Sequence, residues 1–248
     1  MLPGHTAKRI YVGGPSRVSS VDRLSALPDG VLHIIMSFLP ARHAVQTSVL
    51  SRCWRDIWCS MPCINIDDQE FEVNLYATYQ MTQQKWDRFV NFATNLLLFH
   101  RNSVSLDKFR IYTHPFNKPN VDRWIRLGIK YCPSVLEIVI PCYGNDGPLK
   151  LPHLGSNLCR LTRISLFTVI LDSHFAEVLD SGCPALVDLE LTNCFNYFQD
   201  IKSAKVKKLV LKNCYNVNPG RPMVIITMPS LASLELTIDG GFDKSICL

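Results

Sequence analysis

Hydrophobic side chains recur at helical spacing in the segment LSALPDGVLHIIMSFLP, residues 24–40. Val31, Ile35 and Leu39 are four positions apart, which places them on one face of an α-helix. Pro28 suits the first helical turn because that turn needs no backbone N–H from it. Pro40 cannot continue the helix, so the pattern predicts a helix between the two prolines.

The segment from residue 41 to 60 predicts more helix. ARHAVQTSVL is either a short second helix or a turn that leads into a third one. In the stretch that follows, Leu50, Trp54 and Trp58 are spaced as one face of a helix. A neighbouring stripe consists of Val49, Cys53 and Ile57. Three short helices rarely form a stable core alone, so we expect this unit to dock on the rest of the chain or on another protein.

A different pattern, Leu-x-x-Leu-x-Leu with Val, Ile or Phe allowed, begins at residue 106. Its copies are Leu106, Phe109, Ile111; Val135, Ile138, Ile140; Leu161, Ile164, Leu166; Leu186, Leu189, Leu191; Val206, Leu209, Leu211; and Leu231, Leu234, Leu236. The first positions are 29, 26, 25, 20 and 25 residues apart, within the range of about 20–29 for leucine-rich repeats. Two copies end in a cysteine, Cys194 and Cys214, three residues after the last leucine. The alternative is a set of unrelated, half-buried strands.

Helical segments separate these predicted strands. VDRWIRLGIKYCP and DSHFAEVLDSGCP each carry apolar side chains on one face before a Cys-Pro stop. Residues 61–105 are longer than one repeat and are expected to link the two regions. They hold the apolar helix face Trp86, Phe89, Val90, Ala93 and Leu97, and Cys63–Ile66 is a candidate first, irregular strand.

Alternation along the predicted strands divides their side chains between two faces. The leucines point inward, and the residues between them line a shared surface of the kind that repeat proteins use for binding. For any one of these residues, a solvated strand face is the alternative. The candidate target-binding residues are Lys108, Arg110, Tyr112, Arg163, Phe167, Asp188, Glu190, Lys208 and Lys212.

Composition narrows the class of protein. Of the 248 residues 47% are hydrophobic and 19% charged, so the chain can bury a sizeable core. The net charge of +5 is lower than a dedicated nucleic-acid binder usually shows. Residues 1–21 lack the apolar run of a signal peptide and are expected to be a flexible leader. We expect no membrane span, and reduced cysteines in an intracellular protein of the nucleus or cytoplasm.

No catalytic or metal-binding motif emerges. Cys53, Cys59 and Cys63 are not spaced as a paired Cys-x-x-Cys zinc motif, so no metal or cofactor is expected. Asp67 and Asp68 are interpreted as a solvated loop rather than a catalytic pair. A basic run could offer a surface to an anionic partner, but no aromatic platform for nucleic acid accompanies it. The run consists of Lys202, Lys205, Lys207, Lys208 and Lys212.

The helical segment DRLSALPDGVLHIIMSFLPARHAVQTSVLSRCWRDIW resembles an F-box of the plant type that precedes leucine-rich repeats. Its Leu-Pro opening and its Val-Leu-Ser…Trp close match that family. VDRWIRLGIKYCPSVLEIVI and LDSGCPALVDLELTNC resemble the repeats of the same family. The resemblance covers roughly residues 22–238.

The resemblance implies an α+β fold, with an N-terminal three-helix F-box followed by an α/β leucine-rich-repeat solenoid. The expected division is a leader at 1–21, the F-box at 22–60, a linking segment at 61–105 and repeats at 106–248. Longer family members carry further repeats and another C-terminal domain, so a short or truncated member is expected.

The implied function is that of a non-catalytic substrate receptor in a Skp–cullin–F-box ubiquitin ligase. The F-box would bind a Skp-type adaptor, and through it a cullin, while the repeats bind a protein target that the sequence does not identify. The implied adaptor-binding residues are Leu27, Pro28, Val31, Leu32, Ile35, Leu39, Val49, Leu50, Ser51 and Trp54. On this interpretation Trp54 faces the adaptor, and Trp58 packs toward the chain's own core.

Three alternatives remain open. The apolar F-box residues could pack only against the repeats. The chain could be a short form that occupies the adaptor without delivering a target. It could also be a repeat scaffold for an anionic partner.

Overall fold

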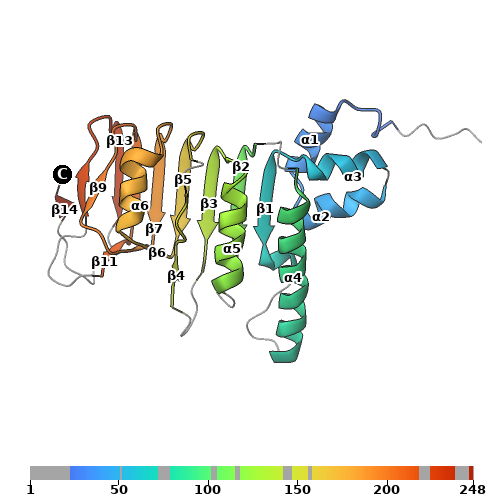
Figure 1. Cartoon of the computed structure of the whole chain (residues 1–248), viewed down its shortest axis with the longest axis horizontal. Helices are drawn as coiled ribbons and strands as arrows, with labels where there is room; N and C mark the ends of the chain where they lie inside the picture. The colour runs from blue at the N-terminus through green and yellow to red at the C-terminus, as the bar shows by residue number, and fades with distance from the viewer. Residues whose placement is uncertain are drawn as a thin grey trace, which may run out of the picture.

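The computed structural model describes residues 23–50, 52–71, 79–101, 105–114, 118–141, 147–155, 158–217, 224–237 and 246–247. A helical module at the N-terminal end leads into an array of parallel β-strands flanked by helices (Figure 1). The predicted α+β class is therefore confirmed. No helix among the described residues has the length and apolar character needed to cross a membrane.

The N-terminal module contains the predicted helices. They are α1 (Asp29–Ser37), α2 (Ala41–Gln46) and α3 (Arg52–Cys59), with a 3₁₀ turn, η1 (Thr47–Val49), before α3. Pro28 and Pro40 stand directly before α1 and α2, where the missing N–H of proline costs nothing. The module has a small core of its own, formed by Leu32, Met36, Ala44, Trp54, Ile57 and Met61.

In the described part of the chain, one parallel sheet contains seven strands in the order of the sequence. They are β1 (Cys63–Asp67), β2 (Lys108–Tyr112), β3 (Val135–Val139), β5 (Arg163–Phe167), β7 (Asp188–Thr192), β10 (Lys208–Lys212) and β13 (Ser233–Thr237). The first residue of each strand pairs with the first residue of the next, so the whole ladder is in register. We call this the long sheet.

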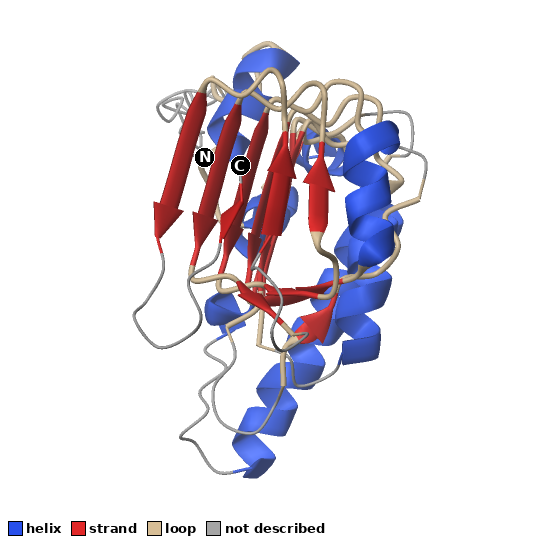
Figure 2. Cartoon of the chain, turned by 90° about the vertical axis from the view of Figure 1, so that its left-hand side faces the viewer, coloured by secondary structure: helices blue, strands red, loops and turns tan. Residues whose placement is uncertain are grey.

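The helices and short strands described between neighbouring strands of the long sheet lie behind it (Figure 2). The β1–β2, β2–β3 and β5–β7 connections carry the helices α4 (Tyr79–Phe99), α5 (Lys118–Ile129) and α6 (Ser173–Glu177), the last continued by a π-helical turn η4 (Val178–Gly182). A 3₁₀ turn, η2 (Asp68–Phe71), follows β1. Short strands fill a second parallel sheet, β4 (Leu149–Lys150), β6 (Val169–Leu171), β8 (Phe195–Asn196) and β11 (Tyr215–Asn216).

A third parallel sheet replaces the helices toward the C-terminal end. It contains β9 (Asp200–Lys202), β12 (Val224–Thr227) and β14 (Ile246–Cys247). The change begins where the connection is shortest, since only 20 positions separate Asp188 of β7 from Lys208 of β10. A strand spans about 3.3 Å per residue and a helix only 1.5 Å. A short connection therefore spans the distance to the next strand of the long sheet with extended chain rather than with a helix.

The array begins earlier than the sequence indicates. Residues 61–105 are predicted as a linking segment with an amphipathic helix and a candidate strand, and α4 and β1 lie at these places. Strand β1 pairs with β2 along all five of its residues, so it is a regular member of the long sheet rather than an irregular strand. The alternation of apolar and polar residues in β1 extends over too few residues, beside a long helix, for the sequence to reveal its pairing with β2.

Most of the predicted inward set fills the core between the long sheet and its connections. In the second copy Leu136 takes the buried position and Val135 is only half-buried, and in the last copy Leu231, Leu234 and Leu236 are only partly buried. Residues 109, 111, 136, 138, 164, 166, 189, 191, 209 and 211 are all buried. Trp124 of α5 is fully buried, stands edge-on to Phe89 of α4 at 5.2 Å between ring centroids, and donates its indole N–H to Thr94 Oγ1 at 3.0 Å. This aromatic contact joins the first two helices of the array.

The repeated cysteines have a structural role. Cys194 and Cys214 are buried, and their thiols donate to the carbonyl oxygens of Leu166 and Leu191 at 3.5 and 3.3 Å. The residue before each is an asparagine with positive φ, Asn193 at 53° and Asn213 at 49°, a conformation that asparagine tolerates better than most residues. Burial raises the pKa of the Cys194 thiol, as expected for an unreactive side chain.

Replacing Gly128 of α5 by alanine should destabilise the protein. The new Cβ would lie 2.1 Å from ring atoms of Phe109, which is fully buried and cannot move aside. The gain in helix propensity is about 1 kcal/mol, whereas overpacking a core costs about 1–3 kcal/mol and more for so close a contact. We expect the free energy of unfolding, measured in urea, to fall by about 1–3 kcal/mol. Gly30→Ala, where nothing lies within 4 Å of the new Cβ, is the control and should leave stability equal or higher.

Acid should weaken the end of α4 through His100. The ring is buried edge-on to Tyr131 at 4.8 Å between centroids, and burial lowers its pKa to about 4. In the unfolded chain the His100 ring has its ordinary pKa of 6.5 and binds a proton as the pH falls below that value. In the folded protein the ring stays neutral down to about pH 4. This contribution to stability is therefore complete above pH 6.5 and is lost as the pH falls toward 4.

The urea midpoint of unfolding should decrease between about pH 7 and about pH 5. This decrease should be smaller in His100→Gln than in the wild type. His153→Gln changes a half-exposed histidine and serves as the control, with the wild-type fall retained. An equal fall in wild type and His100→Gln would contradict this assignment.

Candidate functional site

The helical module exposes a set of large apolar side chains. Val31, Ile34 and Phe38 follow one another at helical spacing along α1, and Phe38 is 81% exposed. Val49 and Leu50 on and after η1 are also exposed, Val49 at 86%. Exposed apolar groups gathered on so small a unit indicate a surface that a partner covers. We call these five residues the module face.

The last turn of α1 and the η1 turn lie beside each other. The Thr47 hydroxyl is 3.5 Å from the Met36 sulfur, and it also donates to the Ala44 carbonyl at 2.6 Å. These contacts hold η1 against the end of α1 that carries Phe38. The two parts of the module face are thereby fixed relative to each other.

The structure divides the predicted adaptor-binding residues into four groups. Pro28, Val31, Val49 and Leu50 are exposed, whereas Leu27, Ile35 and Leu39 are partly buried against the module's core. Ser51 lies outside the described residues. Leu32 and Trp54 are buried.

The assignment of Leu32 and Trp54 to a partner surface needs correction. They are 0% and 2% exposed in the module's own core, and the Trp54 indole N–H donates to Ser25 Oγ at 3.0 Å. Their side chains hold the helices together and are not offered to a partner. Ile34 and Phe38 were missed, although the spacing of 31, 34 and 38 could have revealed them.

Trp58 lies at the junction between the helical module and the array. It is half-buried and packs against both hydrophobic cores, while Ala41 of α2 is buried within the core of the array. The backbone N–H of Arg42 donates to Glu70 Oε2 at 2.9 Å, and its guanidinium donates to the Glu70 carbonyl at 2.7 Å. The module is therefore packed against the β1 end of the array rather than tethered to it.

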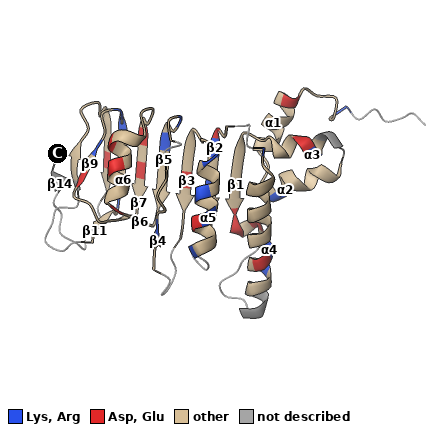
Figure 3. Ribbon diagram, viewed as in Figure 1, with Lys and Arg blue, Asp and Glu red and all other residues tan. Residues whose placement is uncertain are grey.

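The second candidate surface is the outward face of the long sheet. All nine predicted target-binding residues lie on it, because the register places them at alternate positions of adjacent strands. Their charges are largely paired across strands: Lys108 with Glu137 at 2.8 Å, Arg163 with Glu190 at 3.2 Å and Lys212 with Glu235 at 2.9 Å. Basic and acidic side chains accordingly alternate along the array (Figure 3).

Arg110 ties the first strands of this face together. Its guanidinium lies 3.6 Å from Asp67 and from Glu137, donates to Asn65 Oδ1 at 3.0 Å, and lies 5.7 Å from the centre of the Tyr112 ring. Burial raises the pKa of the Asp67 carboxyl, and Arg110 opposes that rise. The network positions Tyr112 at the carboxyl end of β2.

An apolar row crosses the same end of three strands. Tyr112, Val139 and Phe167 are direct neighbours in the register of β2, β3 and β5, and each is partly exposed. Thr192 of β7 continues the row. Aromatic and apolar residues that interrupt a charged surface are typical anchors of protein interfaces.

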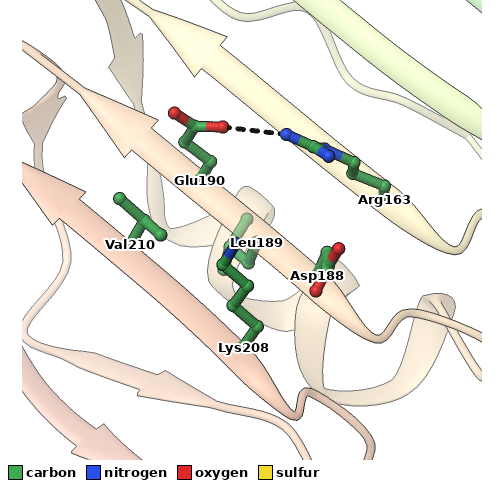
Figure 4. Close-up of a pocket in the computed structure, with 6 residues that line it drawn as sticks. All are labelled: Arg163, Asp188, Leu189, Glu190, Lys208 and Val210. Atoms are coloured by element: carbon green, nitrogen blue, oxygen red, sulfur yellow. Dashed lines mark hydrogen bonds and ion pairs between the residues drawn. The ribbon is translucent and has the colours of Figure 1, made fainter. Parts of the chain in front are cut away.

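A shallow hollow lies farther along the outward face (Figure 4). Val210 is only 5% exposed although it points outward, so it forms an apolar floor among charged side chains. The lining residues are Arg163, Asp188, Leu189, Glu190, Lys208 and Val210. Four of the predicted target-binding residues therefore surround one recess.

The structure also bears on the predicted solvated loop at Asp67 and Asp68. Asp68 is fully buried, and its Oδ2 accepts from the His114 backbone N–H at 2.7 Å, the His114 ring at 2.8 Å and Thr113 Oγ1 at 3.1 Å. The solvated-loop interpretation is wrong for this residue, because its carboxylate joins the exits of β1 and β2. Among the described residues, no group of His, Cys, Asp and Glu is arranged to hold a metal ion.

The basic run of lysines is divided between sheets. Lys208 and Lys212 lie on the outward face of the long sheet, whereas Lys202 belongs to β9 of the third sheet and pairs with Asp200 at 3.9 Å. Lys212 also pairs with Glu235. The run does not form one positive patch, which weakens the case for an anionic partner.

Comparison with known proteins identifies the helical module. Residues 24–65 match the F-box domain family model. The chain is 30% identical over 254 residues to an FBD-associated F-box protein and 27% identical over 257 residues to an F-box/LRR-repeat protein, both of Arabidopsis thaliana. It is also 30% identical over 236 residues to the meiotic F-box protein MOF of Oryza sativa subsp. japonica.

These similarities extend over 90%, 95% and 91% of the chain but over 59%, 52% and 48% of the three relatives. The chain thus spans about half the length of the curated relatives it matches. No solved structure matches the chain.

Proposed function

We propose that this relative of the plant F-box/LRR-repeat proteins is the substrate-recognition subunit of a Skp–cullin–F-box ubiquitin ligase. One observation carries the proposal: the segment that matches the F-box, residues 24–65, contains a helical module with large apolar side chains facing solvent. The module already has its own core and is packed on the array. Its exposed apolar face is therefore available to an adaptor.

Adaptor binding would depend on apolar burial. Covering a side chain such as Phe38 or Val49 contributes about 1.5–3 kcal/mol, so these residues would supply a large share of the binding energy. Leu32 and Trp54 would support this face from below by keeping α1 and α3 in place. We propose Pro28, Val31, Ile34, Phe38, Val49 and Leu50 as the adaptor contacts.

We further propose that the array is a leucine-rich-repeat solenoid that holds a protein target on the outward face of the long sheet. The in-register parallel strands and the recurring leucines support this assignment. The apolar row of Tyr112, Val139 and Phe167 would anchor the target. The paired charges around it would select a partner through complementary placement rather than through net charge.

The receptor itself would perform no bond chemistry. Its contribution would be proximity, since a rigid junction between module and array fixes the target relative to the adaptor. This role would place the protein inside the cell, in the nucleus or the cytoplasm. The adaptor would connect it to a cullin.

Changing the module face should weaken adaptor binding without unfolding the protein. We expect Ile34→Ser/Phe38→Ser to weaken binding to a purified Skp-type adaptor at least about tenfold, because two exposed anchors are lost. The thermal midpoint should stay at the wild-type value. Gln46→Ser, an exposed polar position of α2, is the control and should bind normally.

The buried residues should behave in the opposite way. Trp54→Ala is expected to lower the free energy of unfolding by about 3–5 kcal/mol, the usual cost of removing a large core side chain. Wild-type affinity in the Ile34/Phe38 variant would refute the module face as the adaptor site.

Changing the apolar row should affect targets and spare the adaptor. The wild type and Tyr112→Ser/Phe167→Ser would be captured from cells in which cullin activation is blocked, and co-purified proteins compared by quantitative mass spectrometry. We expect the adaptor at equal abundance and at least one trapped protein lost, since the apolar anchor of the target site is gone. Lys130→Ser, an exposed change beyond α5, should retain the wild-type set. Identical sets in all three samples would contradict the assignment.

A further inference from the structure

The solvent side of α4 changes character at its last turn. Its exposed positions are polar along the described part of the helix, at Gln84, Asp87, Arg88, Asn91 and Asn95. Leu98 and Phe99 then follow, 53% and 64% exposed. Leu96 and Leu97 beside them are buried and already supply the apolar contacts to the core. The two exposed side chains therefore have no packing role in the helix to which they belong.

The residue that follows this apolar turn by two positions is held against α3 of the F-box. The backbone N–H of Arg101 donates to the Cys59 carbonyl at 2.8 Å, and its guanidinium pairs with Asp56 at 2.9 Å. Both contacts are made to the last turns of α3. The end of α4 is thus fixed at one end of the helical module.

Helix α1 reaches the same turns of α3. His33 Nε2 lies 3.1 Å from Ser60 Oγ, which in turn donates to the Asp56 carbonyl at 3.1 Å. Asp56 also pairs with Arg101. A short chain of polar contacts therefore joins α1, which carries much of the module face, to the end of α4.

We propose that Leu98 and Phe99 extend the adaptor-binding surface from the F-box onto the first helix of the array. This inference rests on the proposed function, because its occupant is the Skp-type adaptor. The module face is small, whereas a stable protein interface usually involves about 20–30 residues on each side. A partner seated on the F-box needs neighbouring surface, and the end of α4, which Arg101 holds to α3, exposes two large apolar groups.

The position of α4 argues against the target as occupant. The helix packs behind the long sheet, on the side opposite the outward face (Figure 2). A target held by Tyr112 and Phe167 would have to pass around the β1 end to reach Phe99. An adaptor on the F-box is already at that end.

The test compares two double variants of the full chain. Leu98→Gln/Phe99→Gln removes the apolar pair, and Asn91→Gln/Asn95→Gln alters the same helix face farther from the F-box. Both introduce residues that favour helix. Titration with a purified Skp-type adaptor should show affinity reduced about tenfold in the first variant and unchanged in the second. Circular dichroism and thermal midpoints should match the wild type in both.

A second measurement uses the wild-type complex. Hydrogen exchange of the amides in the last turns of α4 should slow when the adaptor is bound. Wild-type affinity in the Leu98/Phe99 variant, together with unchanged exchange, would overturn the extension while leaving the F-box assignment intact. Absence of adaptor binding by the wild type would overturn the proposed function and the extension together. Loss of a trapped target with adaptor affinity retained would also overturn it, since the target would then be the occupant.

Discussion

In-register stacking of short parallel strands is the constraint on which this structure depends. A five-residue strand with two inward side chains buries little by itself, so each strand gains a core only by lying on its neighbours. Register follows from this, because a shift by one residue would turn leucines outward and lysines inward. The outward face is a by-product of the same alternation, and the inward pattern therefore fixes where a target could bind.

An array of this kind leaves an open edge at each end, and here the two edges differ. The F-box covers the β1 end, where Ala41 is buried in the array core and Trp58 bridges both cores. At the other edge, Leu234 and Leu236 of β13 are only partly buried, unlike the fully buried leucines of β10. The module thus covers the β1 end of the array, and packing fixes its position relative to the long sheet.

Much of this could be predicted from the sequence, and the failures have identifiable causes. Period-two alternation located the strands of the long sheet from β2 onward and assigned outward residues such as Arg163 correctly, because one face of each of these strands is buried and the other is exposed. It did not predict the short strands of the second and third sheets. It indicated β1 only as a candidate irregular strand, since that strand is separated from β2 by a long helix. Asp68 was misjudged because a carboxylate pair in a polar stretch normally indicates solvent, whereas here its Oδ2 accepts from three donors at the next strand's exit.

The sequence by itself determined the helical module, the repeat register, the family resemblance and the absence of any recognisable catalytic motif, because these depend on local spacing. Tertiary structure alone decided which apolar residues of the module face inward. Leu32 and Leu50 both fit a helical stripe, yet Leu32 is fully buried and Leu50 is 64% exposed. Helical period shows that residues share a face of one helix, but burial depends on which face the neighbouring helices cover. The same reason separates buried Leu97 from exposed Phe99, and it is only through such packing that a partner surface becomes visible.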